Sequence, residues 1–304
     1  MAASLASPTP TLWEADCTSA LVAHSRLRRA PDIPLRTASP TSLGPVGCRG
    51  VAGTQAVRLA CSAAQRLDTV PTHRFFGVYN NVGHQLRVLM TQASVINCSA
   101  ATRCGGVLFC TGGESRLVDC HIHGCHIMSA GGELDASGNV GGLDLWSGVL
   151  TMIRGSITGC STLGEHGGAY LSGASTLYLI DVLVADCRSG GGGGIGVNGN
   201  LIMSGGAIRD CHALNGGNGG GLRVLGKVQL SGTTVQGCTA STSEGGGMWF
   251  SSANRQAQLN EVTVQDCSAN EGGGMKISTG EVLLVDVSFE GCQASSRGGA
   301  ILLD

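Results

Sequence analysis

The sequence contains few aromatic residues, few charged residues and no long hydrophobic run. Aromatic residues make up 4% of the 304 residues and charged residues 13%. Because no run of eighteen apolar residues exists, we expect no transmembrane segment in this chain. The net charge is −2, and the scattered Arg and Lys residues have no aromatic platform between them. This composition argues against a nucleic-acid partner.

A clear export signal and a folded N-terminal pattern are also missing. The first residues have no basic n-region and no uninterrupted apolar h-region, so no signal peptide is evident. Residues 1–70 are rich in Ala, Ser, Pro and Arg with little alternation, and we predict an irregular or disordered segment. Within it, a short helix is expected near Ser19–Arg29. Val51–Leu67 is a second candidate helix, which would cap the domain that follows.

Glycine and cysteine, by contrast, are abundant, with 50 and 14 residues. Eight cysteines recur in one motif, which runs apolar residue, two spacers, cysteine, short polar stretch, two glycines and an apolar strand. These are Cys98, Cys125, Cys160, Cys187, Cys211, Cys238, Cys267 and Cys292. Their spacings are 27, 35, 27, 24, 27, 29 and 25 residues, and the long interval accommodates an insertion at Gly131–Val140. A fixed period of this length indicates a repeat architecture.

Each repeat contains three short apolar pieces separated by glycine or polar turns, as in Met275–Ile277, Val282–Val285 and Val287–Phe289. The third piece alternates apolar and polar residues, which is strand periodicity. No window shows helix caps with a 3.6-residue period. Three strands per repeat without a covering helix predict coils that stack at about 4.8 Å. The predicted fold is an all-β, right-handed, single-stranded parallel β-helix of about eight coils of about 26 residues.

These patterns predict two segments. Residues 1–70 form the irregular N-terminal segment, and residues 71–304 form the β-helix domain, which is most regular over 141–304. The last residues, Ile301–Asp304, lie just inside the first strand of a new coil. Because a solenoid normally needs a terminal cap, we expect the domain to be truncated at this end.

The repeat resembles that of the chlamydial polymorphic outer membrane proteins, in which Phe-x-x-Asn is followed by Gly-Gly-Ala-Ile. Phe289 and Gly298–Ile301 match this pattern, while Cys292 stands where that family has Asn. The resemblance covers about residues 90–304 and implies the pectin-lyase-like β-helix superfamily, which includes lyases, hydrolases, adhesins and structural shafts. It also implies an extracellular or cell-surface location.

Two interpretations of the repeat cysteines remain open. Equivalent residues of successive coils lie about 4.8 Å apart at Cα, within the range that a disulfide permits. Because their Cα–Cβ vectors are parallel, the Cβ atoms stay near that distance, which is longer than a relaxed disulfide requires. We favour a ladder of buried, reduced thiols over a disulfide or metal framework, since buried free cysteine behaves as a small hydrophobic residue.

One local cluster contains residue types that bind zinc: Cys120, His121, His123, Cys125 and His126. Its spacing matches no recognised zinc finger. In a strand, the two histidines that flank Ile122 would point to solvent, and one cysteine already belongs to the ladder. We therefore predict exposed histidines, no metal site and no cofactor.

Catalytic groups are sparse in the sequence. Asp181, Glu261 and Asp286 lie six positions before a repeat cysteine, but Arg or Gly occupies that position in other regular coils, so a calcium site is not expected. The glycine-rich runs lack the Gly-Lys-Ser/Thr of a phosphate loop. The insertion at Gly131–Val140 is the one candidate for a catalytic loop, with Glu133 and Asp135 in it and Arg154 nearby in sequence.

An outward row on the third strand is rich in hydroxyl groups and is a candidate binding face. It consists of Ser156, Leu183, Ala207, Thr234, Thr263 and Ser288. Three functions therefore remain. The leading one is a non-enzymatic adhesion, structural or display shaft whose partners are polysaccharides or cell-surface ligands. The alternatives are a carbohydrate-active lyase or hydrolase, and a glycan- or ice-binding solenoid.

Overall fold

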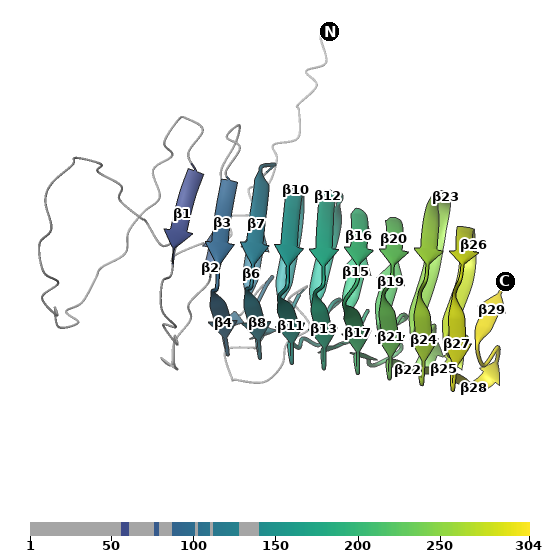
Figure 1. The fold of residues 1–304 in the computed structure, drawn as a ribbon. Coiled ribbons are helices and arrows are strands. Elements are labelled where there is room, and N and C mark those ends of the chain that lie inside the picture. Colours follow the sequence, from purple (N-terminus) through teal and green to yellow (C-terminus); the bar gives the residue numbers. More distant parts are fainter. Residues whose placement is uncertain (1–55, 61–75, 79–86, 101–102, 110–111, 128–139) are drawn as a thin grey trace, which may run out of the picture. The chain divides into compact units, whose positions relative to one another are not determined.

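A computed structural model describes residues 56–60, 76–78, 87–100, 103–109, 112–127 and 140–304. All described elements are β-strands and belong to one compact unit, Gly50–Asp304 (Figure 1). Met1–Arg49 is a separate unit outside the described residues, and the helix predicted near Ser19–Arg29 lies within it.

Successive repeats pair in parallel and form three faces of a solenoid. The first face, sheet A, has fourteen strands. They are β1 (Ala56–Ala60), β2 (Phe76–Val78), β3 (Arg87–Thr91), β6 (Val107–Phe109), β7 (Glu114–Val118), β10 (Leu143–Ile153), β12 (Ala169–Ile180), β15 (Ile195–Val197), β16 (Asn200–Ser204), β19 (Leu222–Val224), β20 (Lys227–Ser231), β23 (Met248–Asn260), β26 (Met275–Val285) and β29 (Ile301–Leu303).

Sheet B has one strand for each repeat cysteine, eight in total. They are β4 (Ser94–Ile96), β8 (His121–His123), β11 (Ser156–Thr158), β13 (Leu183–Ala185), β17 (Ala207–Arg209), β21 (Thr234–Gln236), β24 (Thr263–Gln265) and β27 (Ser288–Glu290). The third face contains β5 (Ser99–Ala100), β9 (His126–Ile127), β14 (Arg188–Ser189), β18 (His212–Ala213), β22 (Thr239–Glu244), β25 (Ser268–Glu271) and β28 (Gln293–Arg297). The predicted all-β parallel solenoid is confirmed, with seven turns separating the eight strands of sheet B.

The short strands of sheet B owe their length to the residues that flank them. The residue six positions before each repeat cysteine and the residue directly before it have φ between 48° and 66°. The earlier set is Gln92, Asp119, Arg154, Asp181, Gly205, Gly232, Glu261 and Asp286, and the later set is Asn97, Gly124, Gly159, Asp186, Asp210, Gly237, Asp266 and Gly291. Asp, Asn and Gly dominate both sets because they adopt left-handed backbone most readily.

The core consists of columns of apolar side chains, one residue per coil. The residue three positions before each cysteine points inward, as predicted. This column is Val95, Ile122, Ile157, Val184, Ile208, Val235, Val264 and Phe289, and all but the last are fully buried. Parallel pairing keeps them in register, for example Val235 with Val264. Alanine forms a second column on the third face, with Ala213, Ala240 and Ala269 in contact.

The glycine pair after each cysteine allows the coils to approach closely. A methyl group on Gly247 would lie 2.5 Å from the carbonyl oxygen of Gly274 and 3.2 Å from Cys267 Sγ. The equivalent Gly221 meets Gly247 and Cys238 in the same way. Cysteine and glycine therefore belong to one packing unit, which explains why they recur together in the sequence.

The candidate helix over Val51–Leu67 differs from the structure. Its residues Ala56–Ala60 form strand β1, which pairs residue by residue with β3. Parallel pairing with the first regular coil satisfies the backbone of this segment on that side. The remainder of the candidate helix lies outside the described residues.

Candidate functional site

The repeat cysteines occupy one corner of every coil, directly after sheet B. None of the ten described cysteines forms a disulfide, and within the repeat set all are buried except Cys98 and Cys292, which are half-buried. Each thiol faces the carbonyl oxygen two residues earlier, at 3.2 Å for Cys187. Six of the eight also face a carbonyl of the preceding coil, as Cys187 does at 3.7 Å from Ile157. The thiols are thus directed into the structure rather than to solvent.

Packing of one thiol beside the next changes their ionisation. Hydrogen bonding with Cys160 and Cys211, together with burial, raises the pKa of Cys187 well above its usual value. Burial likewise raises the pKa of Cys238. Because the thiolate is the nucleophile and metal ligand, a raised pKa makes Cys187 and Cys238 poor nucleophiles and poor metal ligands in the folded state.

The Cys/His cluster is divided between the inside and the outside of the solenoid. Cys120 and Cys125 are buried, whereas His121 and His123 on β8 are exposed. The exposed histidines hydrogen-bond through Nδ1 to hydroxyls of the next coil, at 2.9 Å in both cases. His126 makes a 2.7 Å contact of the same kind with a serine hydroxyl. No group of three or more His, Cys, Asp or Glu within the described ranges is arranged to hold a metal ion.

The candidate residues on sheet B and beside it also have clear positions. The outward row runs in register through β11, β13, β17, β21, β24 and β27, with Leu183 and Ala207 interrupting the hydroxyls. Asp181, Glu261 and Asp286 occupy the left-handed turn before sheet B. In that turn Arg154 pairs with Asp119, its Nε lying 2.9 Å from Oδ1. Glu133 and Asp135 lie outside the described residues.

A shallow notch interrupts the outer surface of sheet A, where each coil turns between its two strand segments. In the coils of β15/β16 and β19/β20 this turn contains two residues. In the preceding coil, four residues of β12 (172–175) separate its pairing with β15 from its pairing with β16. The longer turn stands beside the two shorter ones, and a recess results.

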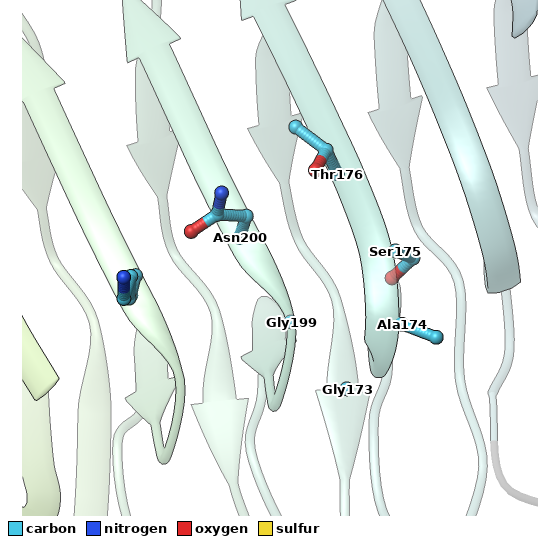
Figure 2. Close-up of a pocket in the computed structure, with 7 residues that line it drawn as sticks. Gly173, Ala174, Ser175, Thr176, Gly199 and Asn200 are labelled. Atoms are coloured by element: carbon cyan, nitrogen blue, oxygen red, sulfur yellow. The ribbon is translucent and has the colours of Figure 1, made fainter. Parts of the chain in front are cut away.

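This notch is a pocket of about 300 Å³ lined by Gly173, Ala174, Ser175, Thr176, Gly199, Asn200 and Lys227. Figure 2 shows the first four along β12 and Asn200 on the adjacent strand. Thr176 is in register with Asn200, and Asn200 with Lys227, so the three side chains stand in successive coils. The lining supplies the Thr176 hydroxyl, an amide and an ammonium group, and contains no carboxylate; the Ser175 hydroxyl already donates to the Ser172 carbonyl at 2.7 Å.

A second outward column on sheet A carries large polar and aromatic side chains. From β10 to β26 it is the second residue after the glycine pair, namely Asp144, Tyr170, Gly196, Arg223, Trp249 and Lys276. The repeat motif in the sequence did not indicate this column. The signal was present, because a position that varies widely within an otherwise regular repeat is free of the packing constraints that define the core.

Asp144 is completely buried near the N-terminal end of this column. Its Oδ2 accepts a hydrogen bond from Trp146 Nε1 at 3.1 Å, while Oδ1 has no partner among the described residues. The guanidinium of Arg103 lies 3.6 Å from the centre of the Trp146 ring. Burial raises the pKa of Asp144 to about 7, although Arg103 and Trp146 favour the charged form. The carboxyl group therefore changes protonation state near neutral pH.

His166 is buried beside the same column. Its ring stacks on Tyr170, with the centroids 4.9 Å apart and the planes 7° apart, and lies over Gly196, where a side chain would collide with it. Nδ1 has no partner among the described residues. Burial and the nearby Arg223 lower the pKa of His166 to about 3, so the imidazole is neutral above that pH. The Tyr170 hydroxyl accepts a 2.9 Å hydrogen bond from Asn198, the residue before Gly199 of the notch.

Lys276 is the centre of a charged network at the other end. Its Nζ lies 2.7 Å from carboxylate oxygens of Glu244 and Glu271 and 2.8 Å from Asp304. Arg297 binds Glu271 in turn, at 2.7 Å. Burial lowers the pKa of Lys276, but the three carboxylates outweigh burial and raise it above its usual value. The network binds three successive coils together.

Comparisons with known proteins agree with this architecture. Residues 145–304 match the family model described as the right-handed β-helix region. No curated protein and no solved structure matches the chain. No helix in the described part of the chain is long and apolar enough to cross a membrane. The predicted right-handed parallel β-helix is confirmed, and it is consistent with the pectin-lyase-like superfamily. The chain belongs to the right-handed β-helix family.

Proposed function

We propose that this protein is a non-enzymatic β-helical shaft that serves adhesion or display at a cell surface or in the extracellular space. The observation that carries the proposal is the unbroken register of sheet B, in which all eight strands pair in parallel with their neighbours. Each coil thereby fixes the position of the next, which gives a stiff support for side chains on its outer faces.

The repeat thiols and Lys276 support the same function, because their polar groups make contacts within the structure. The repeat thiols pack against carbonyls and glycines in the core. Lys276 is held by three carboxylates. We also propose that the thiols remain reduced, so that the column acts as small apolar packing. Polysaccharides or other cell-surface molecules would be the partners of such a shaft.

Two experiments test the proposal. Antibodies against the solenoid should label intact cells that produce the protein, and intracellular labelling alone would contradict the location. The purified chain, incubated with a panel of polysaccharides, should release neither new reducing ends nor unsaturated products absorbing in the ultraviolet. Sustained release of either would contradict a non-enzymatic shaft.

One observation favours a polysaccharide-cleaving enzyme as a second candidate. Asp144, with a pKa of about 7, and the neutral His166 lie on either side of Tyr170, and each retains an atom without a partner among the described residues. A carboxylic acid and a neutral imidazole are suited to general acid and base roles. Cleavage that Asp144→Asn abolishes, with folding intact, would favour this candidate over the shaft.

A further inference from the structure

We propose that the notch beside β12 binds the acidic group, a sulfate ester or a carboxylate, of a saccharide. The inference rests on the proposed function, because it names the class of ligand that the shaft would hold. Three donors line the notch in successive coils: the Thr176 hydroxyl, the Asn200 amide and the Lys227 ammonium group. The ammonium group suits an oxyanion, and the hydroxyl and amide suit neutral hydroxyl groups of the same saccharide.

The charge of Lys227 is available to a ligand. No described residue forms an ion pair with it, whereas Lys276, the only other lysine of the chain, has three carboxylate partners. Carboxylates in the same column of sheet A are engaged elsewhere. Glu114 lies 4.0 Å from Arg87, and Glu281 accepts a 2.9 Å hydrogen bond from Gln256. Lys227 therefore presents an uncompensated positive charge beside two neutral donors.

The notch has a shape that can hold a sugar ring, as a flat surface could not. Its volume of about 300 Å³ is at the lower end of the range for ligand pockets, roughly 300–1,000 Å³. Gly173 and Ala174 form a wall without polar side chains, against which the C–H face of a sugar can lie. Gly199 keeps the floor low, because a side chain there would collide with the carbonyl oxygens of residues 172 and 175.

Successive donors also match the repeat of a saccharide chain. Neighbouring strands stand about 4.8 Å apart, so Thr176, Asn200 and Lys227 are spaced at that interval along the solenoid axis. One sugar unit of an extended glycan advances by a similar distance. A chain lying along the axis would place its acidic group at Lys227 and neutral hydroxyls at the other two residues.

Calorimetric titration of the full chain tests the proposal with four probes: a sulfated dextran oligosaccharide, an oligogalacturonate, neutral dextran of the same length and free sulfate. Binding of at least one acidic oligosaccharide, with neither neutral dextran nor free sulfate bound comparably, is the expected result. Lys227→Gln should weaken that binding about tenfold, the effect of losing one charge-assisted hydrogen bond. Gly173→Trp should abolish binding, because Gly173 has open space around it and the new ring would fill the pocket.

Arg209→Gln is the matched control, since it removes the same charge from an exposed side chain of β17, on another face. It should leave the affinity unchanged, and thermal melting should show all variants folded. Equal binding of charged and neutral dextran, equal binding of free sulfate, or identical affinities of Lys227→Gln and the unsubstituted chain would each overturn the inference. Cleavage of the bound saccharide would contradict the non-enzymatic shaft while leaving the binding site intact.

Discussion

The corner after sheet B has the same backbone and residue pattern in every coil. The bend in sheet A, where each coil turns between its two strand segments, varies from coil to coil. At the corner, every coil has a left-handed residue, a three-residue strand, a second left-handed residue and a cysteine. At the bend, the connection contains two residues in some coils and four in β12. The corner packs into the core, so its sequence is held constant. The bend faces outward, where length and side chains vary, and the notch is formed there.

The largest contrast is expected between the two faces of one sheet B strand. Val264→Asp places an unpaired carboxylate in a fully buried position and should destabilise the solenoid by about 4 kcal/mol or more. Thr263→Asp, on the outward face of the same strand, should cost under about 1 kcal/mol. Urea unfolding curves of both variants measure the difference. Equal urea midpoints for the two variants would contradict the conclusion that Val264 faces the core and Thr263 faces outward.

Adding a methyl group to a glycine should affect stability differently at the corner and at the bend. Gly247→Ala brings a carbon within 2.5 Å of the next coil's backbone and should cost about 3 kcal/mol. Gly173→Ala at the bend has open space and no positive φ, so it should be neutral or stabilise by up to about 1 kcal/mol. Chemical denaturation compares the two. Similar losses from both substitutions would show that the bend is packed as tightly as the corner.

The charged network around Lys276 gives an intermediate effect. Lys276→Met leaves three carboxylates facing one another and should destabilise the last coils by about 2 kcal/mol. Lys276 and Arg297 lower the pKa of Glu271, so this stabilisation is present above the unfolded pKa and is lost as the pH falls through the folded pKa. Hydrogen exchange of β26 and β29 should rise in Lys276→Met at pH 7. An unchanged exchange rate would show that the network does not contribute.

Substitution of Asp144 is expected to give the smallest change in the free energy of unfolding. Unlike the destabilising substitutions above, it should stabilise the protein. Burial raises its pKa to about 7, so its folding contribution is fully present below the unfolded pKa near 4 and is lost as the pH rises to 7. His166, with a pKa lowered to about 3, contributes in the opposite direction between pH 3 and about 6.5. Asp144→Asn should therefore raise stability at pH 8 by about 1 kcal/mol. Lower stability of the variant at pH 8 would contradict the claim that the buried, charged carboxylate of Asp144 destabilises the fold.

The sequence was sufficient for the parts of the structure that repeat. The cysteine period, the alternation in Val287–Phe289 and the glycine pairs predicted the solenoid and the inward column, because neighbouring coils impose the same contact on every unit. It predicted a helix where Ala56–Ala60 form β1, since pairing with β3 overrides local propensity. The notch was not predictable, because it results from turn lengths in different coils that meet only in space.

The most direct test of the account concerns the repeat thiols at the corner. Alkylation without reductant, first under native and then under denaturing conditions, is followed by mass spectrometry of the labelled peptides. The account predicts that the six inner thiols label only after unfolding, while the half-buried Cys98 and Cys292 at the two ends label sooner. Inner thiols that resist labelling even after unfolding would be bridged, and a solenoid held together by disulfides would replace the reduced thiol column.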